Sequence, residues 1–243
     1  MLSLDDVIDL VIPRGSNELV SYIKANTRIP VLGHADGVCH LYVDASADPM
    51  TGSTIAVDAK TDYPSACNAM ETLLLHKDTL CNGVASTILM ALRAAGVKCL
   101  GGPNAMKLGL CDVRATELKR EYGDLTCMVE VVDSMDEAIE WIHTYGSGHT
   151  EAIICDKDSS VGEEFLRRVD AACVFKNAST RFADGFRFGL GAGKQFILST
   201  VLILPHLLKL NICLIPELYH FAQRLVSQPG ASMHEVRSVS KVC

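Results

Sequence analysis

Short apolar runs alternate with amphipathic segments along residues 1–177, and this alternation predicts β-strands that alternate with α-helices. We expect strands at 7–12, 29–32, 38–43, 97–100, 126–132, 151–155 and 172–177. We expect helices at 17–25, 53–60, 79–95, 134–145 and 159–169. Repeated strand–helix units favour parallel pairing, so the predicted fold class is α/β, with a parallel-rich sheet flanked by helices.

Local signals mark the ends of two of these helices. Ser134 is followed three residues later by Glu137, which is the spacing of a capping box. Gly96 follows the predicted 79–95 helix and is a good C-terminal stop. Both signals agree with the helical pattern beside them.

The stretch 62–75 places one thiol where chemistry is expected. The run 67–75 has the composition of a helix, with Ser65 or Ala66 near its N-cap. A thiol in the first turn of a helix faces unpaired backbone N–H groups and the positive end of the helix dipole, and both favour thiolate. Cys67 is therefore a candidate nucleophile. The alternative is a buried structural cysteine, because nine other cysteines are scattered along the chain.

Composition narrows the class of protein. The net charge of −7 argues against a general nucleic-acid binder. The ten cysteines show no Cys-x-x-Cys spacing, so we expect no zinc or other metal site, and scattered thiols suggest a reducing compartment. The N-terminus has the features of neither a secretory signal nor a transit peptide. We therefore expect a cytoplasmic protein, with plastid and mitochondrion left open for a longer parent.

The character of the chain changes after Gly193. Residues 196–215 are mostly apolar, so a membrane span is one hypothesis for them. Pro205, Lys209 and Asn211 fall inside this segment and oppose a span, because each is costly in the bilayer core. A packed apolar segment and a poorly folded tail are the alternatives. From residue 228 onward we expect disorder.

Three further stretches could hold a ligand. Gly15 and Ser16 lie in a strand-to-helix turn whose backbone N–H groups could bind phosphate, although a simple tight turn is the alternative. In the stretch 33–40, His34 and Asp36 lie in a loop and could contact a ligand, whereas His40 is expected to be structural.

The third stretch follows the last predicted strand. Ser179, Thr180 and Arg181 are suited to binding a carboxylate or phosphate, and an Arg181–Asp184 surface ion pair is the alternative. Glu121 could accept hydrogen bonds from ribose hydroxyls, although on its own it reads as surface charge.

Five stretches, in this order, resemble one family. They are Ile12-Pro-Arg-Gly-Ser, Gly33-His-Ala-Asp-Gly-Val-Cys-His, Cys67-Asn-Ala-Met-Glu-Thr-Leu-Leu, Gly148-His-Thr-Glu and Asn177-Ala-Ser-Thr-Arg-Phe-Ala-Asp-Gly-Phe-Arg-Phe-Gly-Leu-Gly. They resemble gamma-glutamyl phosphate reductase, the glutamate-5-semialdehyde dehydrogenase of proline biosynthesis and a member of the aldehyde dehydrogenase superfamily. The residues of these stretches are most similar to those in the reductase half of plant-like pyrroline-5-carboxylate synthases. The resemblance covers about residues 3–192.

The resemblance implies an NADPH-dependent reduction of L-glutamyl 5-phosphate to glutamate 5-semialdehyde, with release of phosphate. Cys67 matches the nucleophile that forms a thioester, and its backbone N–H would help to hold the oxyanion. The implied cofactor-binding residues are Gly15, Ser16 and Glu121. The implied substrate-binding residues are Asn68, Ser179, Thr180 and Arg181.

The resemblance also implies a domain organisation and partners. Residues 1–33 would be a remnant of the cofactor-binding domain, residues 34–192 the catalytic domain, and residues 193–243 a divergent tail. Most of the family's cofactor domain is expected upstream, so the alternative is a catalytically incomplete fragment that keeps the fold. The expected partner is a small-molecule substrate, with no nucleic acid and no membrane. The parent family is homo-oligomeric.

Overall fold

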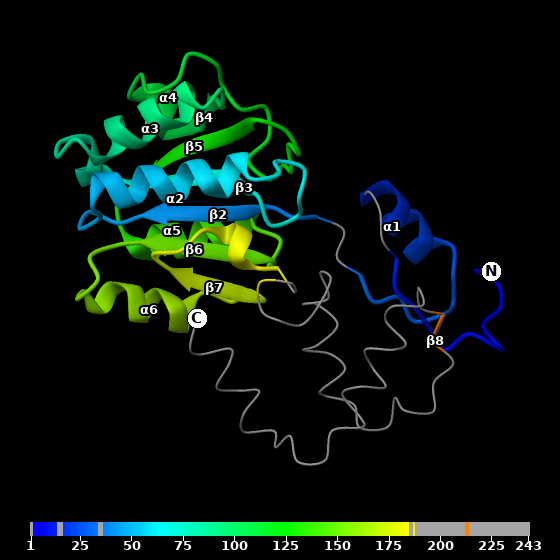
Figure 1. The fold of residues 1–243 in the computed structure, drawn as a ribbon. Coiled ribbons are helices and arrows are strands. Elements are labelled where there is room, and N and C mark those ends of the chain that lie inside the picture. The colour runs from blue at the N-terminus through cyan, green and yellow to red at the C-terminus, as the bar shows by residue number, and fades with distance from the viewer. Residues whose placement is uncertain (1, 14–16, 34–35, 185–186, 188–211, 214–243) are drawn as a thin grey trace. The chain divides into compact units, whose positions relative to one another are not determined.

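The computed structural model describes residues 2–13, 17–33, 36–184, 187 and 212–213. The chain divides into two compact units, one formed by Met1–Ala35 with Phe196–Cys243 and the other by Asp36–Gln195 (Figure 1). The assignment of these units to a cofactor remnant and a catalytic domain stays a prediction.

The larger unit is built around a six-stranded sheet in which all neighbouring strands are parallel. Its strands are β2 (Cys39–Val43), β3 (Met70–His76), β4 (Lys98–Gly101), β5 (Thr126–Val132), β6 (Thr150–Ile154) and β7 (Cys173–Lys176). Their order in the sheet is β4-β5-β3-β2-β6-β7, so β3 and β2 occupy the centre. The predicted α/β fold class with a parallel sheet is confirmed.

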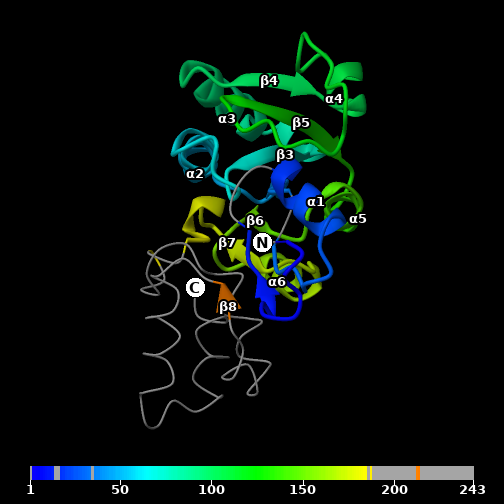
Figure 2. The same cartoon turned by 90° about the vertical axis from the view of Figure 1, so that its right-hand side faces the viewer.

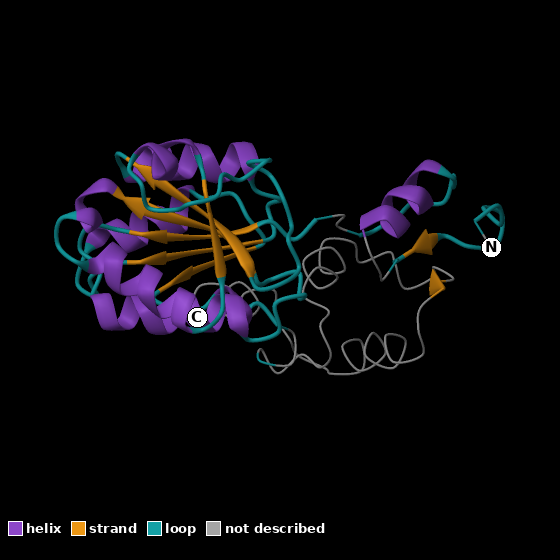
Figure 3. Cartoon of the chain, turned by 90° about the horizontal axis from the view of Figure 1, so that it is seen from above, coloured by secondary structure: helices purple, strands orange, loops and turns teal. Residues whose placement is uncertain are grey.

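Helices cover both faces of this sheet (Figures 2 and 3). Helices α2 (Pro49–Thr61) and α3 (Val84–Ala94) pack on one face, and α5 (Met135–Tyr145) and α6 (Ser160–Arg168) pack on the other. The short α4 (Pro103–Lys107) and two 3-10 turns, η1 (Lys77–Leu80) and η2 (Thr180–Phe182), complete the unit.

The central strand shows how the sheet buries both faces. Leu73 and Leu75 on β3 contact the cluster under α2 and α3, while Leu74 contacts the cluster under α5 and α6. All three side chains are fully buried. Strand residues alternate between faces, so a strand covered by helices on both sides needs an unbroken apolar run.

Helix starts follow local capping chemistry. The Asp48 carboxylate accepts a hydrogen bond from the Thr51 N–H at 2.7 Å at the start of α2. Ser134 Oγ accepts from the Glu137 N–H at 3.3 Å at the start of α5, as its sequence predicts. These bonds satisfy backbone donors that have no partner inside the helix.

The smaller unit contains β1 (Leu10–Val11), α1 (Asn17–Ala25) and β8 (Ile212–Cys213). Strand β1 pairs in parallel with β8, and Val11 forms a parallel bridge with Val31. The α1 bounds agree with the predicted helix at 17–25. The predicted strand at 29–32 is reduced to this single bridge.

The predicted helix at 67–75 is wrong. The segment forms a turn followed by strand β3, and six of the seven β3 residues are buried. A continuous apolar run is compatible with a buried helix or with a buried parallel strand, and composition does not separate them. Pairing with β2 on one side and β5 on the other decides in favour of the strand.

The predicted helix at 79–95 is too long at its start. Helix α3 begins at Val84, because Gly83 precedes it with φ of 84°, in the left-handed region. The preceding residues form η1 and a turn instead. The structure also adds α4, which the hydrophobic pattern did not predict.

No helix in the described part of the chain is long and apolar enough to cross a membrane. The segment 196–215, which raised the hypothesis of a span, lies outside the described residues except for 212–213. The same holds for the expected disorder from residue 228 onward.

We predict that Ile88→Ala on α3 lowers the free energy of unfolding by about 2–5 kcal/mol, because it leaves a cavity in the core between helix and sheet. Met90 lies on the same helix with 61% of its surface exposed, so Met90→Ala should change stability by less than about 0.5 kcal/mol. Urea unfolding of both variants measures the difference. Equal losses would contradict the assigned core.

Candidate active site

Cys67 lies in a turn at the amino end of β3, not in the first turn of a helix. The argument from the helix dipole therefore does not apply to this thiol. Cys67 is partly buried. Because β2, β3 and β6 are adjacent and parallel, their amino ends lie side by side. The segments that precede these strands therefore meet at one end of the sheet, here called the amino edge. The candidate site is built from these preceding segments.

The segment before β2 lies directly against Cys67. Cys39 Sγ donates a hydrogen bond to the Cys67 carbonyl oxygen at 3.3 Å. A Cβ added to Gly37 would lie 2.6 Å from Cys67 Cα and closer still to the carbonyl oxygen. Only glycine allows the two backbones to approach this closely.

Glu121 reaches the same place from the loop before β5. Its Oε2 accepts a hydrogen bond from the Gly37 N–H at 3.1 Å, while the side chain stays exposed. The structure therefore brings this carboxylate to the segment that contacts Cys67. Gly15 and Ser16, the other expected cofactor-binding residues, lie outside the described residues.

The expected substrate-side residues lie on the other flank of the turn. Asn68 is buried, and its Nδ2 donates to the Ala183 carbonyl oxygen at 2.9 Å. The Arg181 guanidinium donates to Asn68 Oδ1 and to the Asp62 carbonyl oxygen. Arg181 therefore contacts the turn beside Cys67.

Ser179 and Thr180 both lie inside the protein, at the start of η2. Ser179 caps η2, accepting a hydrogen bond from the Arg181 N–H at 3.2 Å. Thr180 is fully buried, and no described residue partners its Oγ1. Their role as substrate ligands stays a prediction, as does that of Asn68.

The segment 177–183 runs from the carboxyl ends of the strands to their amino ends. It begins at the carboxyl end of β7, where the Asn177 N–H donates to the Ile153 carbonyl oxygen at 2.8 Å. It ends at the turn before β3, where Ala183 accepts from Asn68. The sequence predicted a ligand loop at the carboxyl edge, whereas the structure takes the loop to the amino edge.

A buried polar cluster supports the amino edge beside β2 and β6. His40 and Glu151 are fully buried, with Nδ1 and Oε2 separated by 3.0 Å. His149 Nδ1 lies 2.8 Å from Thr150 Oγ1 and 3.9 Å from Cys39 Sγ. His40 is structural, as the sequence suggested.

Cys39 was missed from the sequence, since its position on a strand gives no signal of chemistry. Burial, reinforced by the negative charge of Glu151, holds the pKa of the Cys39 thiol well above its usual range. Cys39 therefore stays protonated and can donate its hydrogen bond to Cys67.

A buried ion pair links α2 to the loop that carries Glu121. Lys60 Nζ lies 2.8 Å from Glu71 Oε2, and both side chains are fully buried. Glu71 Oε1 also accepts from the Gly123 N–H at 3.2 Å. Burial raises the pKa of the Glu71 carboxyl to about 7, although the Lys60 ammonium opposes this rise.

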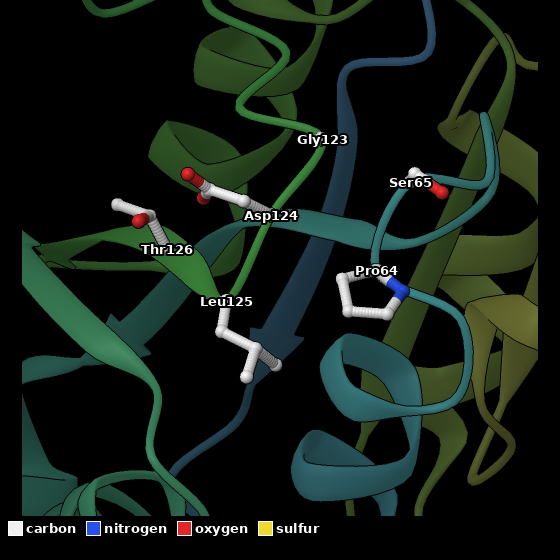
Figure 4. A pocket seen from close by; sticks show the side chains of 6 residues that line it. All are labelled: Pro64, Ser65, Gly123, Asp124, Leu125 and Thr126. Atoms are coloured by element: carbon white, nitrogen blue, oxygen red, sulfur yellow. The ribbon is translucent and has the colours of Figure 1, made fainter.

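A shallow hollow of about 520 Å³ opens beside the turn. Pro64 and Ser65 form one wall, and residues 123–126 form the other (Figure 4). Ser65, Asp124 and Thr126 supply its polar groups, and Cys67 follows Ser65 by two residues. Within the described ranges, no group of three or more His, Cys, Asp or Glu side chains could hold a metal ion.

Comparison with known proteins shows which sequences this chain resembles. No family model matches it. The chain is 60% identical over 192 residues to the delta-1-pyrroline-5-carboxylate synthase of Solanum lycopersicum, covering 79% of this chain and 26% of the synthase. It is 52% identical over 193 residues to the gamma-glutamyl phosphate reductase of Synechococcus sp. (strain RCC307), covering 79% of this chain and 43% of that protein. This chain is homologous to gamma-glutamyl phosphate reductases.

The solved structures agree with the sequence relatives. The gamma-glutamyl phosphate reductase of Thermotoga maritima matches with a TM-score of 0.73 at 40% identity, covering 79% of this chain and 46% of that one. An NADP-dependent glyceraldehyde-3-phosphate dehydrogenase from Bacillus halodurans, solved with NADP, matches with a TM-score of 0.56 at 14% identity, covering 71% of this chain and 44% of that one. The second match shows the fold alone. The expected aldehyde dehydrogenase-like fold is confirmed.

The chain spans about a quarter of the plant synthase and less than half of the reductases that it matches. These relatives are reductases, as the sequence resemblance implied. Their activity and ligands are carried to this chain only as proposals.

We predict that Gly37→Ala displaces the turn that carries Cys67, because the new Cβ would overlap the Cys67 backbone. The variant should lose about 1–3 kcal/mol of stability, and the alkylation rate of Cys67 should change several-fold. Gly52→Ala is the matched control, because its Cβ would meet the movable end of the Ile88 side chain. Peptide mass spectrometry of alkylated protein measures the rates, and an unchanged Cys67 rate in Gly37→Ala would refute the contact.

We predict a pH dependence of stability from Glu71. Its pKa is raised to about 7 in the folded state from an ordinary value of 4.5, so folding favours the protonated carboxyl. The stability from this group is complete below about pH 4.5 and is lost as the pH rises through about 7. The unfolding free energy of the wild type, relative to Glu71→Gln, should therefore fall by about 3 kcal/mol across this window. The exposed Glu164→Gln is the control and should give a flat difference.

Proposed function

We propose that this chain carries the acyl-transfer centre of a glutamate-5-semialdehyde dehydrogenase. The proposed reaction is the NADPH-dependent reduction of L-glutamyl 5-phosphate to glutamate 5-semialdehyde and phosphate. The observation that carries the proposal is the turn with Cys67, which is fixed on both flanks and lies beside the carboxylate of Glu121. The homology to reductases supports the choice of substrate.

Cys67 performs the covalent step in this proposal. Its Sγ attacks the acyl carbon, and the carbon–oxygen bond to phosphate breaks, which leaves a thioester and free phosphate. When bound, NADPH supplies the hydride that reduces the acyl carbon. The carbon–sulfur bond then breaks, the aldehyde leaves, and Cys67 is restored as the thiolate that attacks in the first step. A fixed turn favours this chemistry because the attacking sulfur does not have to be ordered in each turnover.

The described residues fit one part of a nicotinamide cofactor. Glu121 is exposed, and its Oε2 is anchored by the Gly37 N–H, so the carboxylate is oriented beside the turn. A carboxylate held in this way suits two vicinal hydroxyl donors of a ribose. We therefore propose that Glu121 contacts the cofactor ribose and that Gly15 and Ser16 also bind the cofactor.

The second candidate is a folded chain that does not turn over. The observation that favours it is the span of this chain, which covers 26% of the plant synthase and 46% of the solved reductase. Such a chain would keep the six-stranded sheet and the turn with Cys67. It would show no saturable binding of NADPH.

Titration with NADPH, followed by an assay of phosphate-dependent NADPH formation from pyrroline-5-carboxylate, separates the two candidates. In the first case we expect saturable binding and turnover, and Cys67→Ser should reduce turnover by about 10³-fold or more without loss of binding. Cys81→Ser is the matched control, since Cys81 is an exposed thiol in another turn. Absence of both binding and turnover in the folded chain would reject the first candidate.

A further inference from the structure

One arginine joins both ends of the turn that carries Cys67, here called the nucleophile turn and defined as residues 62–69. Arg181 Nε donates to the Asp62 carbonyl oxygen at 2.5 Å and lies 3.5 Å from the Asp62 carboxylate. Its Nη1 donates to Asn68 Oδ1. Asp62 begins the turn and Asn68 follows Cys67 directly, so one guanidinium spans the turn.

Asn68 is held at both ends of its amide. Oδ1 accepts from Arg181, and Nδ2 donates to the Ala183 carbonyl oxygen at 2.9 Å. The side chain is 3% exposed, so a lost partner would leave a buried amide group unsatisfied. The neighbour of Cys67 therefore has one favoured position.

These contacts use the donors that a substrate would need. A guanidinium binds a carboxylate or phosphate with two nitrogens of one edge, either Nε with Nη2 or Nη1 with Nη2. Nε is bonded to Asp62, so the edge formed by Nε and Nη2 has one donor already used inside the protein. Nη1 donates one of its two hydrogens to Asn68. The side chain is also 12% exposed. The Nε edge is therefore not available for a bidentate grip on substrate.

We propose that Arg181 is a positioning residue, which fixes the place and electrostatic surroundings of the Cys67 thiol by closing the nucleophile turn through Asp62 and Asn68. The proposal rests on the proposed function, in which Cys67 is the nucleophile, and it replaces the expected role of Arg181 as a substrate ligand. The Cys67 carbonyl is held from the other side by Cys39 and Gly37. The arginine thus completes a clamp whose other half belongs to β2.

Bonding two acceptors with one side chain in this way requires an arginine. Its planar fork reaches two acceptors at fixed directions, whereas a lysine ammonium is a single point charge. Charged or titratable groups around the turn include Asp62 within it, Cys39 on β2 with His149 beside it, Glu71 on β3, Glu121 before β5 and Arg187 after η2.

The chain offers a matched control for this arginine. Arg187 Nη2 lies 2.9 Å from the same Asp62 carboxylate, but its side chain is 37% exposed. In the described part of the chain it makes no hydrogen bond with Asn68. Arg187→Ala therefore removes one cation from Asp62 and leaves the clamp on Asn68 in place.

The test measures the alkylation of Cys67 by iodoacetamide in the full chain, followed by peptide mass spectrometry over a range of pH. We expect Arg181→Ala to slow the reaction about tenfold at neutral pH and to shift its pH midpoint, because the turn that holds the thiol loses the contact that joins its ends. Arg181→Lys keeps the charge but lacks the planar fork, so amide exchange of residues 62–69 should again be faster than in the wild type. Arg187→Ala should change neither quantity, and the exposed Cys81 should react alike in every variant.

A cycle with Asn68 separates positioning from general destabilisation. Asn68→Ser breaks the same bond from the other side, so the double variant with Arg181→Ala should change Cys67 little more than either single variant. Cys127 is fully buried and reports on folding. If Arg181→Ala makes Cys127 accessible to alkylation, Arg181→Lys replaces it in the double-mutant cycle with Asn68→Ser. The double variant should again change the reaction of Cys67 little more than either single variant.

Two results would overturn the proposal. One is a wild-type rate and pH midpoint for Cys67 in Arg181→Ala while Cys127 stays protected. The other is simple additivity of the Arg181 and Asn68 changes. Alkylation needs neither cofactor nor turnover, so a chain that shows the expected changes without turnover would reject only the proposed function. Turnover with an unchanged Cys67 would reject only the positioning role.

Discussion

The candidate site depends on the two-sided restraint of the turn before β3. Gly37 and Cys39 hold the Cys67 backbone from one side, and Arg181 with Ala183 holds Asn68 from the other. None of these partners is near Cys67 in sequence. A short turn on its own has many conformations, and ordering each residue costs on the order of 1–2 kcal/mol. The restraint offsets this cost by contacts between segments that the sheet brings together.

Two buried polar pairs lie at the amino edge of the sheet. His40 on β2 contacts Glu151 on β6, and Lys60 on α2 pairs with Glu71 on β3. Burying charges is costly, so such pairs contribute little net stability unless their remaining atoms are also bonded. Glu71 meets this condition through the Gly123 N–H. The pair therefore fixes the loop before β5, which also carries Glu121.

The parts of the structure that were predicted correctly share a local cause. The helix at 17–25 and the strand at 126–132 agree with the structure, and Ser134 caps α5 through the predicted bond. In each case a short window of sequence contains the whole signal, either a periodic pattern or a cap. The helix predicted at 67–75 was wrong, because the apolar run of strand β3 is equally compatible with a helix.

The sequence by itself determined the alternation of strands and helices and the parallel α/β class, and it predicted Cys67 as the candidate nucleophile. Only the tertiary structure decided that Cys67 precedes a strand, and that Arg181 bonds to Asp62 and Asn68 across 119 and 113 residues of chain. Local patterns reflect the geometry of one element, whereas these contacts depend on how several elements pack. That packing turned an expected helix start into a turn that Arg181 contacts from both sides of Cys67.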